Sequence, residues 1–267
     1  MSGIAGGVGI ASAALPQSVH YDTGMAPWWV AVAAAGIALL PRRYCGWVAA
    51  VLFLWGAGGV VLDAFRAFFW VTGIPAGSFA EVDWPGAARR MTCLVAAAVL
   101  STGLLRGGES RHVWGSSWLG YAAFAAGFPY PMLKLYWSLG GSLARPAVYN
   151  EGMPVMELFC LVAGAAVSLA LVQSWGRRLP RVVVLIPAWF ATGVLINMGA
   201  LMVFGITSQA LGITDGPVDF DDASSLLGVG AVYLSWLVFG LTLGGATWAY
   251  QRTTRPIASI IPETVRL

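Results

Sequence analysis

Lys134 is the only lysine of the chain, and it lies inside an apolar stretch that runs from about residue 114 to 139. A charged side chain near the middle of a bilayer costs roughly 2.5–3.5 kcal/mol on insertion scales, so such residues usually have a partner. Asp63 and Glu157 lie in other apolar stretches, at a similar expected depth below the outer membrane surface. The sequence therefore predicts an ion pair between Lys134 and one of these two carboxylates.

Three further residues complete the predicted site. Tyr130 and Trp137 share a helix face with Lys134, because they are spaced four and three residues from it. Asn197 adds a polar amide near the middle of another apolar stretch. We expect a polar ligand-binding pocket in the outer half of the bilayer, made by Lys134, Glu157, Asp63, Asn197, Tyr130 and Trp137.

Two plainer interpretations of these residues stay open. The long Lys134 stem lets the ammonium reach the headgroups without any partner. Alternatively, the charges form a structural network that fixes only how the helices pack against each other. Arg66, three residues after Asp63, also competes for that carboxylate.

The amino-acid composition indicates whether these residues lie in water or in a membrane. Hydrophobic residues make up 58% of the 267 residues, and charged residues only 10%, against about 25% in an ordinary soluble domain. The charges lie in short clusters between apolar stretches and form no basic patch of the kind that binds nucleic acid. We therefore expect an integral protein of the bacterial plasma membrane, with the lipid bilayer as its first partner and no nucleic acid.

The apolar stretches predict an all-α, polytopic membrane bundle of seven transmembrane helices. They cover about 27–40, 45–65, 91–105, 114–139, 153–175, 182–206 and 226–250. Arginines dominate alternate loops and the C-terminal end, which predicts an N-terminus outside and a cytoplasmic C-terminus. Residues 1–250 then form one transmembrane domain and 251–267 a cytoplasmic tail. A six-helix count, with the first stretch lying on the membrane surface, is the alternative.

Prolines and glycines modify this pattern. Pro129 and Pro131 are expected to interrupt the helix before Lys134 and to free carbonyls near residues 125–127. Glycine pairs such as Gly56 with Gly59 and Gly240 with Gly244 indicate close helix packing. Residues 66–90 form a long predicted outer loop. Short similarities between stretches two and four, and between three and five, suggest repeated hairpins, although shared Ala/Val composition explains them equally well.

The segment around Lys134 resembles a known kind of protein. Pro129-Tyr130-Pro131 is followed by Leu133-Lys134, Trp137 and Gly140-Gly141. This pattern resembles an uncharacterised actinobacterial family of multi-pass membrane proteins with an LKxxWxxGG-type helix. The resemblance implies a membrane location and an importance for Lys134 and Trp137, and it carries no activity.

These observations predict a protein that binds or transports a small molecule. A membrane enzyme acting on a lipid or isoprenoid, with Asp63 or Glu157 as general acid, is one alternative. A non-catalytic accessory subunit of an oligomer or membrane complex is another. We expect no cofactor and no metal: the two histidines fall on opposite sides of the predicted membrane, and the acidic run 215–222 is better placed to cap the last helix.

Overall fold

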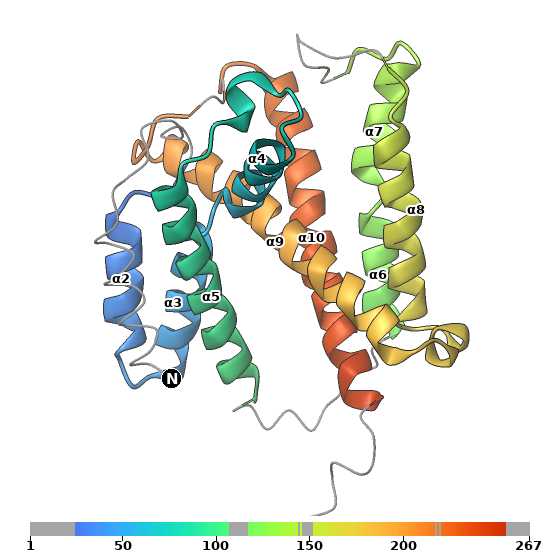
Figure 1. The fold of residues 1–267 in the computed structure, drawn as a ribbon, viewed down its shortest axis with the longest axis horizontal. Helices are drawn as coiled ribbons and strands as arrows, with labels where there is room; N and C mark the ends of the chain where they lie inside the picture. The colour runs from blue at the N-terminus through green and yellow to red at the C-terminus, as the bar shows by residue number, and fades with distance from the viewer. Residues whose placement is uncertain are drawn as a thin grey trace, which may run out of the picture. The chain divides into compact units, whose positions relative to one another are not determined.

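All regular secondary structure in the described part of the chain is helical. The computed structural model describes residues 25–106, 117–143, 145, 152–216, 218 and 220–254, and every regular element within them is a helix (Figure 1). The elements are α2 Trp29–Ala38, α3 Arg43–Gly56, α4 Val60–Thr72, η1 Gly77–Ala80, α5 Trp84–Arg106, α6 Ser117–Ala126, α7 Pro129–Ser138, α8 Val155–Ala170, η2 Ser174–Arg178, α9 Arg181–Ala210 and α10 Ala223–Thr253. The all-α prediction is confirmed for these residues.

Within the described ranges, four helical segments are long and apolar enough to cross a membrane. They are Arg43–Thr72, Trp84–Leu105, Arg181–Ala210 and Gly230–Thr253. The expected stretch 114–139 instead contains two helices of ten residues each, α6 and α7, and each is shorter than the roughly 20 residues that a spanning helix needs. The described residues thus have the makeup of a helical membrane protein, with four segments of spanning length among them.

The chain divides into two compact units. Unit 1 contains α2 to α5, α9 from Asn197 onward and α10 up to Tyr233. Unit 2 contains α6 to α8, η2, α9 up to Ile196 and α10 from Leu234 onward. Each unit is described separately below.

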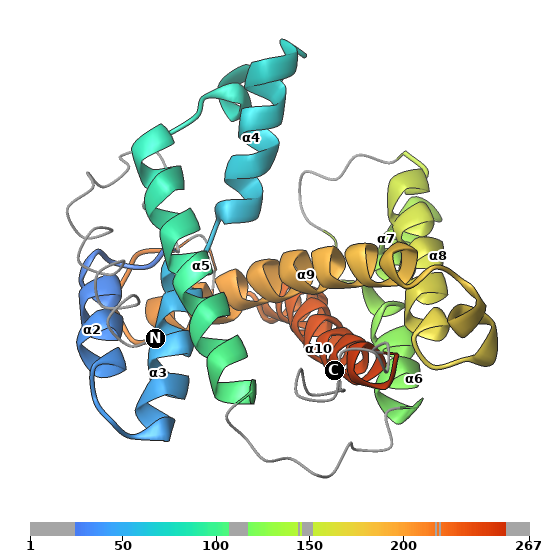
Figure 2. The same ribbon diagram turned by 60° about the horizontal axis from the view of Figure 1, so that its bottom comes forward.

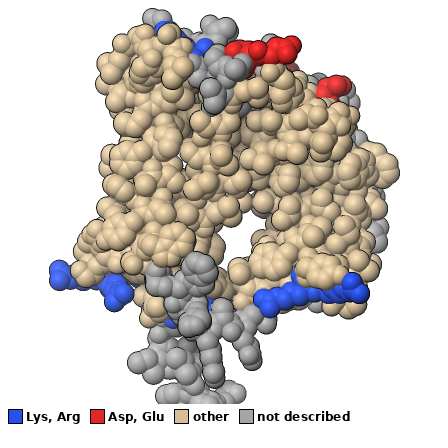
Figure 3. Space-filling model, turned by 180° about the vertical axis from the view of Figure 1, so that it is seen from behind, with Lys and Arg blue, Asp and Glu red and all other residues tan. Residues whose placement is uncertain are grey.

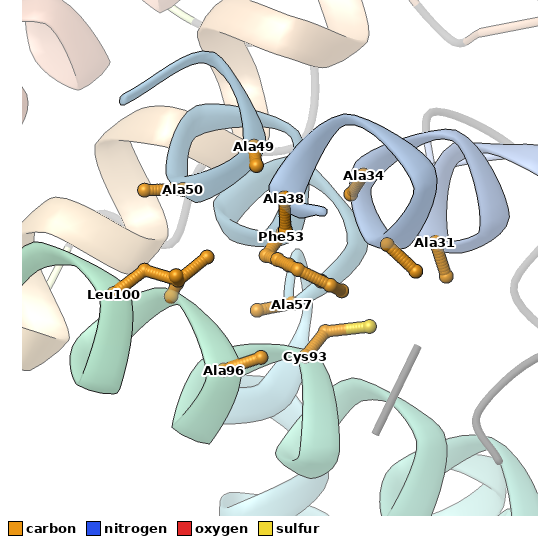
Figure 4. Packing of buried hydrophobic residues seen from close by; sticks show 12 residues of the cluster. Ala31, Ala34, Ala38, Ala49, Ala50, Phe53, Ala57, Cys93, Ala96 and Leu100 are labelled. Carbon is orange, nitrogen blue, oxygen red and sulfur yellow. The ribbon is translucent and has the colours of Figure 1, made fainter. Parts of the chain in front are cut away.

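Small side chains hold unit 1 together. Ala34, Ala49 and Phe53 are fully buried where α2, α3 and α5 meet (Figure 4). A methyl group added to Gly56 would lie 3.1 Å from the Cys93 sulfur, so α3 and α5 approach closely at this glycine. Close approach supplies van der Waals contact in lipid, where helices gain no hydrophobic drive from one another.

Glycines have the same role in unit 2. A methyl group at Gly240 would lie 2.8 Å from the backbone nitrogen of Ile196, and one at Gly244 would lie 2.9 Å from the Thr192 side chain. These contacts join α10 to α9 and agree with the packing predicted for this glycine pair. Phe239 and Leu243 fill the adjacent core.

The segment 66–90 is mostly helical, and its prediction as a long loop is wrong. Helix α4 continues to Thr72, and α5 begins at Trp84 rather than near Met91. Pro85 is the second residue of α5, where a missing N–H costs no hydrogen bond. As a result, Arg90 is a helix residue, and it is buried rather than placed in a loop.

Candidate ligand site

The spanning segment of unit 1 is interrupted in its middle. Helix α3 ends at Gly56, and α4 begins at Val60. Gly59 takes a left-handed backbone with φ of 92°, which L-residues rarely adopt. Figure 2 shows α3 and α4 as separate helical segments joined by this short link. The break interrupts the main-chain hydrogen-bond ladder in the middle of a segment long enough to span a membrane.

Asn197 of α9 is bound to this break. Its Nδ2 donates a hydrogen bond of 2.9 Å to the Ala57 carbonyl, and the residue is 1% exposed. The bond fixes the orientation of the amide, because only the nitrogen of Asn197 can donate to a carbonyl. Its Oδ1 is buried and accepts no hydrogen bond from any described residue. The break therefore carries an unsatisfied acceptor.

A second unsatisfied polar atom lies in the last turn of α3. The Trp55 Nε1–H is buried and has no acceptor among the described residues. The indole stacks on Phe204 of α9 with a centroid separation of 5.6 Å. Phe204 is seven residues from Asn197, so both project from one face of α9. An unsatisfied donor and an unsatisfied acceptor thus border the same helix face.

Asp63 lies in the first turn of α4 and is paired with Arg90 of α5. The Arg90 Nε and Nη2 atoms donate to the two carboxylate oxygens at 2.6 and 2.9 Å. The Asp63 side chain is 6% exposed and the Arg90 side chain is 2% exposed. The Arg90 Nη2 atom also lies 3.5 Å from the Asp83 carboxylate. This bidentate geometry is the strongest form of carboxylate recognition. The predicted partners of Asp63 were Lys134 and Arg66, and the prediction overlooked Arg90.

Four of the six predicted residues come together in unit 2. The Lys134 Nζ atom lies 3.9 Å from the Glu157 carboxylate, and each side chain is about a quarter exposed. The ammonium also lies 5.8 Å from the Tyr130 ring centroid and 5.9 Å from the Trp137 ring centroid. Trp137 is buried, and its Nε1 donates to the Leu143 carbonyl at 2.8 Å. Lys134 thus has a carboxylate and two aromatic faces around it.

The predicted interruption before Lys134 is present. Helix α6 ends at Ala126, and α7 begins at Pro129. The Ala125 carbonyl, expected to be freed, accepts a hydrogen bond of 3.2 Å from the Phe128 N–H. The turn between the two helices therefore provides a hydrogen-bond donor for at least one of the carbonyls that the prolines leave without a helical partner.

The predicted pocket is divided between the units. Asp63 and Asn197 belong to unit 1, whereas Lys134, Glu157, Tyr130 and Trp137 belong to unit 2. Sequence reasoning missed Arg90 and Trp55. A carboxylate buried at Asp63 needs a positively charged partner, and this requirement could have pointed to Arg90. The prediction of 66–90 as an outer loop placed Arg90 outside the bilayer instead. Nothing in the sequence distinguishes the unsatisfied indole of Trp55 from the other twelve tryptophans.

The acidic run 215–222 precedes the last helix. Asp222 directly precedes Ala223, the first residue of α10, and its carbonyl accepts the Leu226 N–H at 3.1 Å. This is the position that the capping interpretation requires.

Comparison with protein-family models, curated proteins and solved structures finds no match to the chain. The resemblance to the actinobacterial family around Lys134 therefore stays a prediction, and functional argument depends on the geometry.

Proposed function

We propose that this chain is an integral membrane protein that binds or transports a small polar molecule at the α3–α4 break. The observation that carries the proposal is the Asn197 amide. Its nitrogen is bound to the Ala57 carbonyl, and its buried Oδ1 has no partner among the described residues. A buried polar atom without a hydrogen bond costs about 1–3 kcal/mol, so a native fold keeps one mainly where something else binds it.

The interrupted helix supports a ligand site rather than a simple span. Irregular backbone at membrane depth is tolerated only where protein or a wet cavity covers it. Transporters commonly form their sites from discontinuous helices of this kind. A second break separates α6 from α7, and α7 begins at Pro129, five residues before Lys134 of the Lys134–Glu157 pair. We propose that this pair forms part of the same function.

The unsatisfied atoms indicate the chemistry of the ligand. Asn197 Oδ1 needs a donor, and Trp55 Nε1 needs an acceptor. Asp63 and Arg90 pair with each other, so neither of these two charges is left for the ligand to balance. A small neutral molecule with hydroxyl or amide groups fits both requirements, and a free lipid headgroup would bring a charge.

We further propose seven membrane crossings in the plasma membrane, with the N-terminus outside and the C-terminus in the cytoplasm. Support comes from the distribution of charge. Figure 3 shows blue Lys and Arg side chains along the lower edge of this face, whereas the red acidic side chains lie near its upper edge, where a few blue side chains also lie. Cytoplasmic loops of membrane proteins are enriched in arginine and lysine.

One observation favours an accessory subunit as the second candidate. The Asp63–Arg90 pair is buried and doubly hydrogen-bonded, as a purely structural lock between α4 and α5 would be. In that case the polar atoms would serve only helix packing. The enzyme alternative has Glu157 as its remaining acid, since both Asp63 oxygens are occupied.

A thermal-shift screen of the full-length protein in detergent tests the proposal. The panel contains neutral polyols, sugars, amides and nucleosides. We expect at least one solute to raise the melting temperature, because ligand at 100 times its Kd stabilises by about 2.7 kcal/mol. Asn197→Leu should abolish the shift. Thr242→Val is the matched control, since the Thr242 hydroxyl bonds only within α10. No shift with any solute, or a shift that Asn197→Leu retains, would contradict the proposal.

A further inference from the structure

One end of unit 2 brings three segments together. The Tyr250 hydroxyl of α10 donates to the Gly176 carbonyl of η2 at 3.3 Å. The Arg181 Nη2 atom, at the start of α9, donates to the Gln251 carbonyl at 2.9 Å. The end of α10, the start of α9 and η2 are therefore held at one place.

Among the described residues, this end of unit 2 carries positive charge that no nearby acid balances. Arg177 and Arg178 lie in η2, Arg181 begins α9, and Arg252 lies in the last turn of α10. Glu157 is the one acid within the described part of unit 2. It lies in the first turn of α8, roughly 20 Å from the other end of that helix at 1.5 Å per residue, and it faces Lys134. The four arginines thus have no local carboxylate among these residues.

Apolar surface continues directly from the arginines. Val182, Ile186 and Phe190 of α9 are 61%, 65% and 73% exposed, and α9 is one of the helices able to cross a membrane. Trp175 and Leu179 flank the two η2 arginines and are each 40% exposed. This surface suits acyl chains, with the tryptophan at headgroup level.

The geometry is partly fixed in advance. Arg181 is tethered through Nη2 to Gln251, and its buried Nε has no partner among the described residues. The Arg252 guanidinium lies 5.0 Å from the Trp248 ring centroid, which restrains its side chain. Guanidinium groups held in this way recognise phosphate oxygens through paired hydrogen bonds.

We infer that the four arginines Arg177, Arg178, Arg181 and Arg252 form a site for the phosphate of an anionic phospholipid, whose acyl chains lie along the exposed face of α9. We choose a phospholipid because the four arginines can bind its negatively charged headgroup and the adjoining apolar face of α9 can contact its acyl chains. Basic clusters at the ends of membrane helices bind anionic headgroups in this way. This inference is independent of the proposed solute site in unit 1.

Native mass spectrometry of the full-length protein in detergent tests the inference. The probes are phosphatidylglycerol, phosphatidylcholine and inorganic phosphate. We expect phosphatidylglycerol to bind at least tenfold more tightly than phosphatidylcholine, and millimolar phosphate not to displace it. Arg177→Gln/Arg178→Gln should weaken phosphatidylglycerol binding by roughly 20-fold, at about fivefold for each arginine.

Arg42→Gln/Arg43→Gln is the matched control, because it removes the same charge from unit 1. We expect less than about a threefold change there. Equal weakening by the two double variants would mean general attraction to arginine, and would overturn the site. So would equal binding of both lipids, or displacement by inorganic phosphate. If the Arg177/Arg178 variant is not produced in folded form, Arg252→Gln with wild-type unfolding behaviour should weaken binding about fivefold, and an unchanged affinity would overturn the inference.

Discussion

The polar side chains of the apolar helices divide into satisfied and unsatisfied groups. Asp63 has both oxygens bound by Arg90, and Lys134 has Glu157 with two aromatic rings. Asn197 has only its nitrogen bound. The cost of burying charge predicted Lys134 and its acids from the sequence. It did not predict Arg90, whose burial depends on where α5 begins.

The buried ion pair predicts a large asymmetry between single and double substitutions. Arg90→Met leaves the Asp63 carboxylate buried without its partner, which should cost about 3–5 kcal/mol of unfolding free energy. Asp63→Leu/Arg90→Met removes both charges and should recover most of that loss. Unfolding of the purified protein by denaturing detergent measures the difference. A double variant as unstable as Arg90→Met would show that the pair is not a coupled unit.

The Lys134–Glu157 pair predicts a much smaller effect. Both side chains are about a quarter exposed, so solvent screening limits the pair to less than about 1 kcal/mol of stability. Lys134→Met should therefore fold and melt close to wild type. The same unfolding titration measures this. A loss of several kcal/mol of unfolding free energy would mean that Lys134 is needed for the stability of the fold. That result would favour the accessory-subunit function.

At the scale of the helices, one of the two helix breaks could be predicted from the sequence and the other could not. Pro129 and Pro131 revealed the α6–α7 break, because proline lacks the N–H that a helix interior needs. The α3–α4 break was hidden, because Gly56 and Gly59 also fit a helix-packing pattern, and Gly56 does pack against Cys93. The loop prediction for 66–90 failed at its end, because Pro85 lies in the first turn of α5.

Three glycine substitutions test the α3–α4 break. Gly59→Ala places a methyl group at positive φ, and the nearest atom, the terminal Cε of the flexible Met25 side chain at 2.6 Å, can move aside, so it should destabilise by about the 1–2 kcal/mol of the backbone cost. Gly73→Ala shares the positive φ but meets open space, and should show only that backbone cost. Gly36→Ala lies in a helix with open space and should stabilise by about 0.5–1 kcal/mol. Thermal unfolding of the three variants measures the order, and a stabilising effect of Gly59→Ala would contradict the left-handed backbone at this break.

At the scale of the whole molecule, composition alone predicted the class of protein. A chain with 58% hydrophobic and 10% charged residues has too few polar residues for a water-facing coat, and every regular element among its described residues is a helix. The number of continuous spans and the division into two units were not predictable, since both depend on contacts between distant segments. The predicted C-terminal tail lies outside the described residues beyond Thr254.

The proposed orientation predicts opposite labelling of two exposed positions. Ser142→Cys, after α7, should react with a membrane-impermeant maleimide on intact cells, and Thr253→Cys, at the end of α10, should react only after lysis. Both changes are made in a chain whose three native cysteines are alanine. The reverse pattern would place the C-terminus outside, and labelling of both positions on intact cells would remove one crossing between them.

The central claim is that the buried amide of Asn197 binds something other than protein. The most direct measurement is an experimental structure of the full-length protein in lipid nanodiscs, at a resolution that shows ordered small molecules. We predict non-protein density about 2.7–3.2 Å from Asn197 Oδ1, with Nδ2 still bonded to the Ala57 carbonyl. A structure in which Oδ1 accepts a hydrogen bond from the protein itself, with no such density, would contradict the claim.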